Sequence, residues 1–300
     1  MRARGSIFII MVTHKKDLGQ NFLVNKKIIR DLVETAKISE NDTVLEIGAG
    51  TGNVTKEIAK RAGKIFAVEF DRDLIPTLQN NLNDYNNVTI LNKDILKINL
   101  SQLEFRNSEL EISAIVGSIP FQITSPLIHK LFMELQPPHS SNPETRPRKT
   151  PSTINREGVE EAAEPHMNNS PPPTITILIQ KEVAEKITAE PPNANYLSNF
   201  VRGLANVTYI QRISKTAFNP QPKVDGAIIK IMPHYNVLIN YNISPKQWGA
   251  FLHKGFRYPR KMLRNTFDET ALKKANINPR SRPQELRLNQ WVALYKTISQ

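Results

Sequence analysis

A strand that runs directly into a glycine-rich turn is the feature that most constrains the fold of this chain. The turn reads Gly48-Ala49-Gly50-Thr51-Gly52; it follows the apolar stretch 44–47, and a helical pattern begins at Val54. Because glycine lacks a Cβ atom, this backbone can turn tightly and approach a ligand closely. A strand, a glycine turn and a helix in this order predict an α/β sheet with a nucleoside-binding site at the end of a strand.

The spacing of the glycines favours S-adenosyl-L-methionine over a dinucleotide. The dinucleotide fingerprint G-x-G-x-x-G needs a third glycine at position 53, which is occupied by Asn53. Here the glycines alternate instead, and the acidic Glu46 precedes the first of them by two positions. S-adenosyl-L-methionine has no pyrophosphate to be cradled, so it fits this spacing better. The sequence also shows no hydride-site histidine or tyrosine motif, which argues against a NAD-dependent oxidoreductase.

Two acidic residues follow the glycine turn at the ends of the next two predicted strands. Glu69 closes the strand 65–69, and Asp94 follows the strand 88–91. A carboxylate at the first position can accept hydrogen bonds from ribose hydroxyls, and one at the second can accept a hydrogen bond from an adenine amino group. Either residue alone is equally well explained as a solvated strand end. Both together, in this order, favour a cofactor site.

The fourth predicted strand, 112–116, ends in the run Gly117-Ser118-Ile119-Pro120-Phe121. An exocyclic aromatic amine is a poor nucleophile, because its lone pair is delocalised into the ring. We predict that Ser118 and a backbone carbonyl, held by the turn at Pro120, accept hydrogen bonds from the N–H groups of such an amine. Phe121 can stack on the extruded base. On its own the run also fits an ordinary strand-to-helix turn, but its place after the other motifs favours amino-methyl transfer.

With these motifs the sequence resembles the KsgA-like ribosomal RNA adenine dimethyltransferases, which modify small-subunit RNA. Matching segments occur in the family's order from about residue 14 onward: 18–23, 46–52, 117–127, 180–185, 218–225 and 256–265. The resemblance implies the Rossmann-like doubly wound sheet of class I S-adenosylmethionine-dependent methyltransferases. It also implies N6,N6-dimethylation of two adjacent adenosines in a 3′-terminal hairpin loop of small-subunit (16S) rRNA, on the immature small ribosomal subunit.

The family's site residues transfer to this chain position by position. The cofactor-binding residues implied are Asn21, Leu23, Gly48, Gly50, Glu69, Asp94 and Ser118, and the catalytic run is Ser118 to Phe121. The family normally has asparagine where this chain has Ser118; serine has a shorter reach but still accepts a hydrogen bond.

Two other functions stay open beside small-subunit dimethylation. One is an Erm-like methyltransferase of large-subunit rRNA. Asp225 and the segment 256–265 argue against it. The other is an RNA-binding assembly factor with weakened catalysis, against which the retained cofactor residues speak.

The charge of the chain fits an RNA partner. Forty Lys and Arg residues face 28 Asp and Glu residues, for a net charge of +12 and an isoelectric point near 9.8. Such an excess favours a polyanion, most simply RNA, and charge carried only for solubility is the less favoured alternative. The absence of cysteine excludes disulfides and thiolate metal sites, and the six histidines show no ligand spacing, so no metal is assigned. No apolar run is long enough to span a membrane. We expect a cytoplasmic monomer.

The chain is expected to contain an N-terminal extension (1–13), a methyltransferase domain (14–240) and a helical RNA-binding domain (241–300). The extension indicates an extended start or a mis-assigned initiation codon. The segment 137–173 contains nine prolines and few aliphatic residues. It cannot bury enough apolar surface to offset its ordering entropy, so we expect a disordered, inert insertion rather than a regulatory one. Later strands are expected at 174–179, 204–213 and 227–232.

The C-terminal region combines an apolar stripe with clustered positive charge. Trp248, Phe251, Leu252 and Phe256 recur at helical spacing. Four cations follow one another at spacings of three and four, which predicts one shared helical face despite the interruption by Pro259. We predict that this face binds RNA phosphates through Arg257, Arg260, Lys261 and Arg264. A solvated helix face is the alternative. The further cations Lys254, Arg280, Arg282 and Arg287 favour RNA.

Overall fold

The computed structural model describes residues 20–100, 112–135, 153–154, 160–161, 172–234, 238 and 240–299. It divides into two compact units whose segments alternate along the chain. The sheet unit is made of Met1–Leu131, Pro173–Thr188 and Val207–Met232; the helical unit is made of Phe132–Pro172, Ala189–Asn206 and Pro233–Gln300. The helical unit thus includes stretches that precede residue 241, where the sequence had suggested a boundary.

The predicted extension 1–13 lies outside the described residues, as does most of the predicted insertion 137–173. Within the insertion the structure describes a short antiparallel pair of two-residue strands, β6 (Thr153–Ile154) and β7 (Glu160–Glu161). The prediction that the insertion is disordered therefore stays a prediction.

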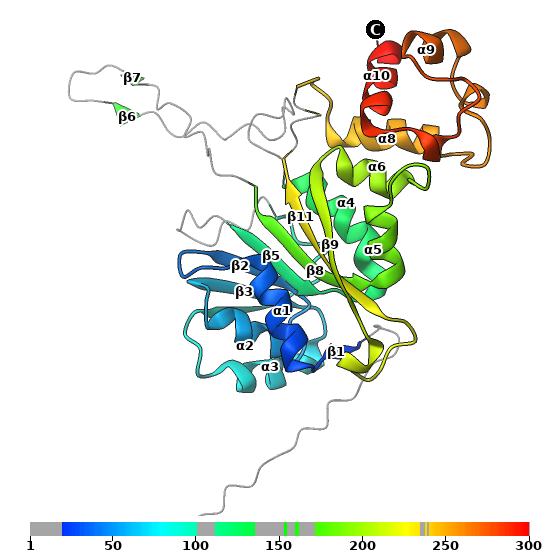
Figure 1. Ribbon diagram of the computed structural model, residues 1–300. Helices are drawn as coiled ribbons and strands as arrows, with labels where there is room; N and C mark the ends of the chain where they lie inside the picture. The colour runs from blue at the N-terminus through cyan, green and yellow to red at the C-terminus, as the bar shows by residue number, and fades with distance from the viewer. Residues whose placement is uncertain are drawn as a thin grey trace, which may run out of the picture. The chain divides into compact units, whose positions relative to one another are not determined.

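A seven-stranded sheet with the order β4-β3-β2-β5-β8-β11-β9 organises the sheet unit (Figure 1). Neighbours are parallel from β4 to β8, and β11 is antiparallel to β8. The strands are β2 (Thr43–Ile47), β3 (Lys64–Glu69), β4 (Val88–Asn92), β5 (Ala114–Ser118), β8 (Thr174–Gln180), β9 (Ala205–Ile213) and β11 (Gly226–Pro233). The order reverses between β2 and β5, and open α/β sheets bind ligands at the carboxyl ends of the strands at such a switch point.

Helices follow the strands as in a doubly wound fold. They are α1 (Lys26–Ala36), α2 (Asn53–Ala59), α3 (Ile75–Leu82), α4 (Thr124–Glu134) and α5 (Lys181–Thr188), with short 3-10 turns at Arg72–Leu74 and Phe121–Ile123. The Asn25 side chain begins α1 by accepting hydrogen bonds from the backbone N–H groups of Lys27 and Ile28. α2 begins without a side-chain cap, because it follows Gly52 of the glycine turn directly.

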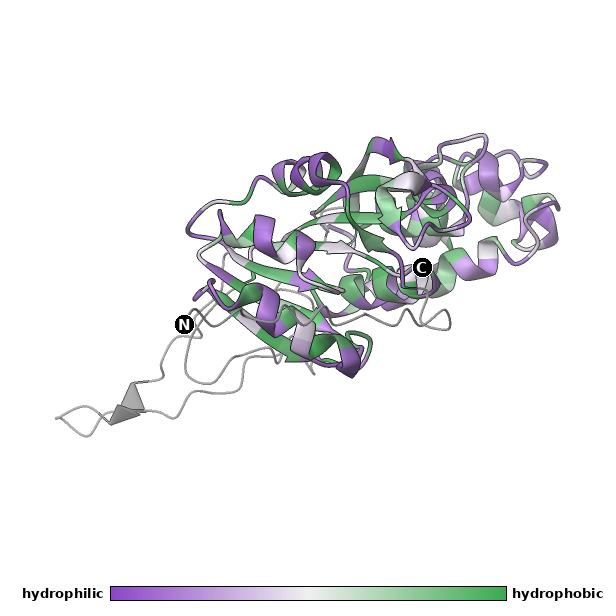
Figure 2. Ribbon diagram, turned by 90° about the horizontal axis from the view of Figure 1, so that it is seen from below, coloured by the Kyte–Doolittle hydropathy of each residue, from purple (hydrophilic) through white to green (hydrophobic). Residues whose placement is uncertain are grey.

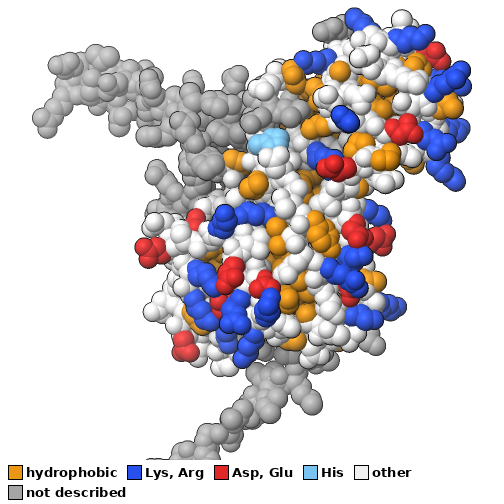
Figure 3. Space-filling view, in the orientation of Figure 1, with side chains coloured by type: hydrophobic (Ala, Val, Ile, Leu, Met, Phe, Trp, Pro, Cys, Tyr) orange, Lys and Arg blue, Asp and Glu red, His pale blue; other side chains and the backbone are white. Residues whose placement is uncertain are grey.

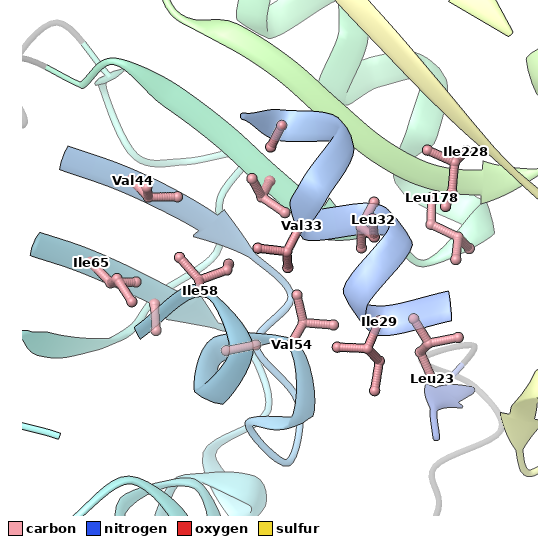
Figure 4. Close-up of a cluster of buried hydrophobic side chains, with 14 of the residues drawn as sticks. Leu23, Ile29, Leu32, Val33, Val44, Val54, Ile58, Ile65, Leu178 and Ile228 are labelled. Atoms are coloured by element: carbon pink, nitrogen blue, oxygen red, sulfur yellow. The ribbon is translucent and has the colours of Figure 1, made fainter. Parts of the chain in front are cut away.

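Both faces of the sheet are buried at its central strands. Alternate residues such as Val44, Ile65 and Leu178 share one core cluster with Leu32 and Val33 of α1, and Figure 4 shows these side chains pointing toward one another between α1, α2 and the sheet. The intervening residues are also buried, among them Leu45, Phe66, Ile115, Ile177 and Ile229. In Figure 2 the strands are largely green and the helices alternate purple and green, as amphipathic helices on a buried sheet do.

The sheet confirms the predicted fold class. Each predicted strand is present, with ends shifted by a residue or two. The largest shift is in the fourth strand, which was expected at 112–116 and extends through Gly117 and Ser118. The reason is that Gly117 and Ser118 continue the ladder by pairing with Ile177 and Leu178 of β8.

The helical unit is built around two buried tryptophans. Its helices are α6 (Tyr196–Arg202), α8 (Pro245–Gly255), α9 (Glu269–Lys274) and α10 (Leu288–Ser299), with 3-10 turns at Leu263–Asn265 and Pro283–Glu285. Trp248 of α8 and Trp291 of α10 are both fully buried. The Phe251 ring lies 6.0 Å from that of Trp248 and 5.8 Å from that of Trp291, so the predicted apolar stripe of α8 forms the core of this unit.

The expectation that Arg257, Arg260, Lys261 and Arg264 share a helical face is wrong. Helix α8 ends at Gly255, residues 257–262 form exposed turns, and Arg264 belongs to a separate 3-10 turn. Pro259 explains the break, because proline has no N–H to donate and disfavours the helical conformation at Tyr258 before it. The four cations are nevertheless all exposed.

Candidate active site

A pocket at the carboxyl ends of β2, β3 and β5 brings together the residues predicted for the cofactor and the reaction. Its lining includes Asn21, Leu23, Gly48, Gly50, Glu69, Asp94, Ser118, Ile119, Pro120 and Phe121. It lies at the switch point of the strand order, where the fold favours a ligand. The four cations predicted to bind RNA are not part of this lining; they belong to the helical unit.

The glycine turn adopts backbone angles that would be strained in a residue with a side chain. Gly48, Gly50 and Gly52 have φ values of 76°, 57° and 86°. A Cβ atom on Gly48 would lie 3.2 Å from the Ser118 carbonyl oxygen, and one on Gly50 would lie 3.0 Å from the Phe22 ring. The turn is fixed to the neighbouring strand, since the N–H groups of Gly48 and Ala49 donate to the Val68 carbonyl at 2.9 and 3.1 Å. The glycines thus keep the floor of the pocket open.

Glu69 is buried and tied to the glycine turn. Its Oε2 accepts a hydrogen bond from the Gly50 N–H at 2.8 Å, and its Oε1 accepts one from the Asp71 N–H at 2.7 Å. Burial raises the pKa of Glu69, and these two hydrogen bonds oppose that rise by stabilising the carboxylate. Each carboxylate oxygen can accept a second hydrogen bond, so the side chain is oriented and still able to bind a ligand.

Asp94 follows β4 and is half-buried at the rim of the pocket. Its Oδ1 accepts a hydrogen bond from the Leu96 N–H at 3.0 Å, and its Oδ2 lies 3.7 Å from the Lys97 ammonium. Nearby, the Asn92 amide donates to the Glu69 and Phe70 carbonyls, fixing the end of β3. The two carboxylates predicted at successive strand ends therefore face one pocket.

The run from Gly117 to Phe121 forms a tight passage from β5 into α4. A Cβ atom on Gly117 would lie only 2.4 Å from the Ile47 carbonyl oxygen, so this position requires glycine. The Ile119 N–H donates to the Leu178 carbonyl at 2.9 Å, and the Ile123 N–H donates to the Pro120 carbonyl at 3.1 Å. The Ser118 hydroxyl has no hydrogen-bond partner among the described residues, which leaves it available in the pocket.

Two short strands cover one side of the pocket. β1 (Phe22–Leu23) pairs with β10 (Phe218–Asn219), and the N–H groups of Val24 and Asn25 donate to the Ala217 carbonyl. The Gln20 amide donates to Asp71 Oδ2 at 2.6 Å. Because Asp71 also donates its own N–H to Glu69, this contact, which we call the Gln20–Asp71 clasp, links the N-terminal segment to the Glu69 carboxylate.

Asp225 supports the loop that carries β10. It accepts hydrogen bonds from the Arg212 guanidinium, with Nε at 2.8 Å, and from the Lys215 N–H at 3.0 Å. These contacts hold the pKa of Asp225 below its usual range, first through the Lys215 N–H and then through Arg212. In the sequence, Asp225 served only as an argument for small-subunit over large-subunit RNA. In the structure it also shapes the loop before Phe218.

Glu46 lies on the α2 side of the sheet and outside the pocket lining. It is 1% exposed, and burial raises its pKa to about 8, with a smaller contribution from the charge of Glu69. A carboxyl group in this environment is mostly neutral at pH 7.

Sequence reasoning missed several pocket residues. The most prominent are aromatic: Phe22, Phe70 and Phe218, with Phe70 57% exposed. Phe70 follows directly after Glu69, so its place next to the strand-end acid is the signal that could have identified it. Phe218 lies in a segment that had been matched to the family without being assigned to the site.

Within the described parts of the chain, no group of three or more histidine or acidic residues could hold a metal ion. The helices described there are all too short or too polar to cross a membrane.

Comparisons with known proteins point to one family. The family model for ribosomal RNA adenine dimethylase matches residues 11–300. Ribosomal RNA small subunit methyltransferase A of Clostridium botulinum (strain Okra / Type B1) is 33% identical over 294 residues, covering 94% of this chain and 93% of the relative. The protein of the same name from Sulfurihydrogenibium sp. (strain YO3AOP1) is 30% identical over 287 residues, covering 95% and 96%.

Two solved structures share the fold. A dimethyladenosine transferase from Plasmodium falciparum has a TM-score of 0.66 and 22% identity, covering 93% of this chain and 97% of that one. The 23S rRNA methyltransferase ErmE has a TM-score of 0.63 and 22% identity, covering 93% and 100%. The fold is accordingly that of the class I S-adenosylmethionine-dependent methyltransferases. From its match over nearly the whole length and its relatives above 30% identity, the chain belongs to the ribosomal RNA adenine dimethylase family.

Proposed function

We propose that this protein transfers methyl groups from S-adenosyl-L-methionine to N6 of two adjacent adenosines in a 3′-terminal hairpin loop of small-subunit rRNA, giving N6,N6-dimethyladenosine. One observation carries the proposal: a single pocket is lined by the glycine turn, by the two strand-end carboxylates and by the run from Ser118 to Phe121. The first two groups suit a nucleoside cofactor, and the third suits an aromatic amine.

The residues of the pocket fit the proposed cofactor. Glu69 is already oriented by two backbone N–H groups and keeps acceptor capacity for ribose hydroxyls. Asp94 lies at the next strand end, where it can accept a hydrogen bond from the adenine amino group. The exposed ring of Phe70 offers an apolar face beside the Glu69 carboxylate. The space over Gly48 and Gly50, which a Cβ atom would fill, leaves room for the remainder of the ligand.

The chemistry asked of the protein is mainly orientation. When bound, S-adenosyl-L-methionine supplies a methyl group already activated by its sulfonium. The Ser118 hydroxyl and a backbone carbonyl of the turn accept hydrogen bonds from the adenine amine, which favours the tetrahedral nitrogen needed for attack. Phe121 and Phe218 line the same pocket and provide aromatic surfaces for the extruded base.

The choice of small-subunit RNA is supported by sequence rather than by fold. The relatives that match over 94% and 95% of the chain bear the name of small-subunit methyltransferases, whereas the likeness to ErmE is one of fold. The retained carboxylates and the free Ser118 hydroxyl speak for an active enzyme and against a weakened assembly factor. Immature small subunits are the proposed partner, with a monomer acting in the cytoplasm, where ribosomes are assembled.

Transfer of labelled methyl groups to two substrates tests the proposal. Undermethylated small subunits and large subunits are incubated separately with the protein and labelled S-adenosyl-L-methionine. We expect label in small-subunit RNA alone. Label in large-subunit RNA would instead favour the Erm-like activity, and cofactor binding with no transfer to either would favour an assembly factor.

A further inference from the structure

A six-residue turn of the helical unit, 257–262, exposes an aromatic ring among positive charges. All six residues of the turn are exposed, and Tyr258 is 45% exposed. Three of the six are Arg257, Arg260 and Lys261. Exposed tyrosines occur singly on many surfaces and need no explanation. The surroundings of this ring are what make it informative.

The turn is held at both ends by the core of the helical unit. Before it, the Phe256 ring packs 5.3 Å from the ring of the buried Trp291. After it, Leu263 is fully buried and donates its N–H to the Ser281 carbonyl at 2.8 Å. Inside it, the Lys261 N–H donates to the Tyr258 carbonyl at 2.9 Å. Pro259 further limits the backbone, so Tyr258 is presented on a constrained loop.

The cations orient the ring and keep their charge available. The Arg257 guanidinium carbon lies 5.4 Å from the centre of the Tyr258 ring, and the Lys261 ammonium lies 5.3 Å from it. Among the residues that the structure describes, no carboxylate forms an ion pair with either cation or with Arg260. Their positive charge is therefore not neutralised within the described fold.

We propose that Tyr258 stacks on an unpaired base of the substrate RNA while Arg257, Arg260 and Lys261 bind the adjoining phosphates. The inference rests on the proposed function and adds to it a residue that reads unpaired nucleotides. Proteins recognise single-stranded RNA by stacking its bases on aromatic rings and guanidinium planes. A turn that carries both groups side by side, with free cations next to them, matches that mode of binding.

The charge of the C-terminal part of the helical unit supports RNA as the partner. Residues 241–300 contain 12 Lys and Arg against 3 Asp and Glu, a balance of +9 within a chain total of +12. Figure 3 shows Lys and Arg side chains gathered over this unit with few acidic ones among them. Long-range attraction of this kind brings a polyanion to the surface, and the tyrosine then contributes contacts that salt does not screen.

Binding measured over a series of salt concentrations separates stacking from phosphate contact. The full-length protein is titrated into a labelled transcript of the small-subunit 3′-terminal hairpin. We expect Tyr258→Ala to weaken binding about fivefold or more at every salt concentration, with an unchanged slope of log K against log salt. Arg260→Ala should weaken binding and also reduce that slope by about one. Tyr258→Phe should bind like the wild type.

Tyr241→Ala is the matched control, because Tyr241 is 43% exposed and has the Lys296 ammonium 3.4 Å from its ring centre. It should leave RNA affinity unchanged, and thermal unfolding should show that all variants fold. Unchanged affinity of Tyr258→Ala for the transcript would overturn the inference. Methylation of small subunits by a wild-type protein that does not bind the transcript would overturn the inference alone, whereas failure both to bind the transcript and to methylate small subunits would refute the proposed function.

Discussion

At position 118 this chain carries a serine whose hydroxyl lines the pocket and has no hydrogen-bond partner among the described residues. Serine reaches less far than the asparagine usual in the family. In the proposed reaction, its freedom from other contacts, together with the turn fixed by Gly117 and Pro120, would let it accept a hydrogen bond from the substrate amine. The short side chain would also leave more room around a nitrogen that already carries one methyl group.

Removing that hydroxyl should affect the rate of methyl transfer far more than the affinity for S-adenosyl-L-methionine. We expect Ser118→Ala to lower the rate of methyl transfer about a hundredfold, equivalent to ~3 kcal/mol, because one preorganised contact to the reacting amine is lost. The dissociation constant of S-adenosyl-L-methionine, measured by calorimetry, should change much less. Ser125→Ala, at an exposed position in α4, is the control. A rate equal to that of the wild type would show that Ser118 does not contact the amine.

Glu46 gives the stability of the protein a predictable pH dependence. Its pKa rises from an ordinary 4.5 to about 8 in the folded protein, mainly through burial. The folded state therefore holds this proton where the unfolded state has lost it, so the free energy of unfolding falls as pH rises from about 4.5 to about 8. We expect Glu46→Gln to flatten this decline, because a neutral amide does not titrate.

Urea unfolding at a series of pH values measures this effect for both proteins. The wild type should lose stability relative to Glu46→Gln across the window, at up to ~1.4 kcal/mol per pH unit. Parallel curves for the two proteins would mean that Glu46 is ionised in the fold.

Among the elements, the short pair β1 and β10 covers one side of the pocket and carries Phe22, Leu23 and Phe218 into the lining. Its position depends on contacts at both ends: the Gln20–Asp71 clasp on one side and the Asp225 loop on the other. We expect this pair to hold the N-terminal segment over bound cofactor.

Opening the clasp should weaken cofactor binding. Gln20→Ala removes a hydrogen bond to a buried carboxylate, and such bonds contribute ~1.5–3 kcal/mol. We therefore expect an increase of about tenfold in the dissociation constant of S-adenosyl-L-methionine, together with faster hydrogen exchange of the amides at 22–25. Gln211→Ala removes a comparable glutamine–aspartate bond, to Asp31, outside the pocket lining and should leave cofactor affinity unchanged. Equal affinities for the two variants would show that the clasp does not support the site.

The elements also show what sequence can and cannot predict. The strands and the glycine turn were predicted because continuous apolar runs and glycine chemistry are local signals. The β1–β10 pair was not, because two-residue strands nearly 200 positions apart leave no periodic pattern. Their spacing alone predicted that Arg257 and Lys261 lie on one helix. The helix ends before them because Pro259 interrupts it. Asp71 and Phe70 were overlooked because their roles arise only when β3 meets the turn after β2.

At the scale of the whole molecule, chemistry and charge are carried by different parts of the chain. The sheet unit contains the entire pocket lining, whereas residues 241–300 carry +9 of the net +12. Such a division is suited to an enzyme whose substrate is a large polyanion, since recognition needs more surface than the reacting base provides. RNA affinity should accordingly fall steeply with salt, while affinity for S-adenosyl-L-methionine should not.

Nucleoside mass analysis of the methylated RNA decides whether this protein dimethylates adenosine in small-subunit RNA. Undermethylated small subunits are treated with the protein and S-adenosyl-L-methionine, and their RNA is digested to nucleosides. We expect N6,N6-dimethyladenosine with the wild type and its loss with Asp94→Ala, which removes a pocket carboxylate. Absence of any methylated adenosine with the wild type, despite measurable cofactor binding, would contradict it.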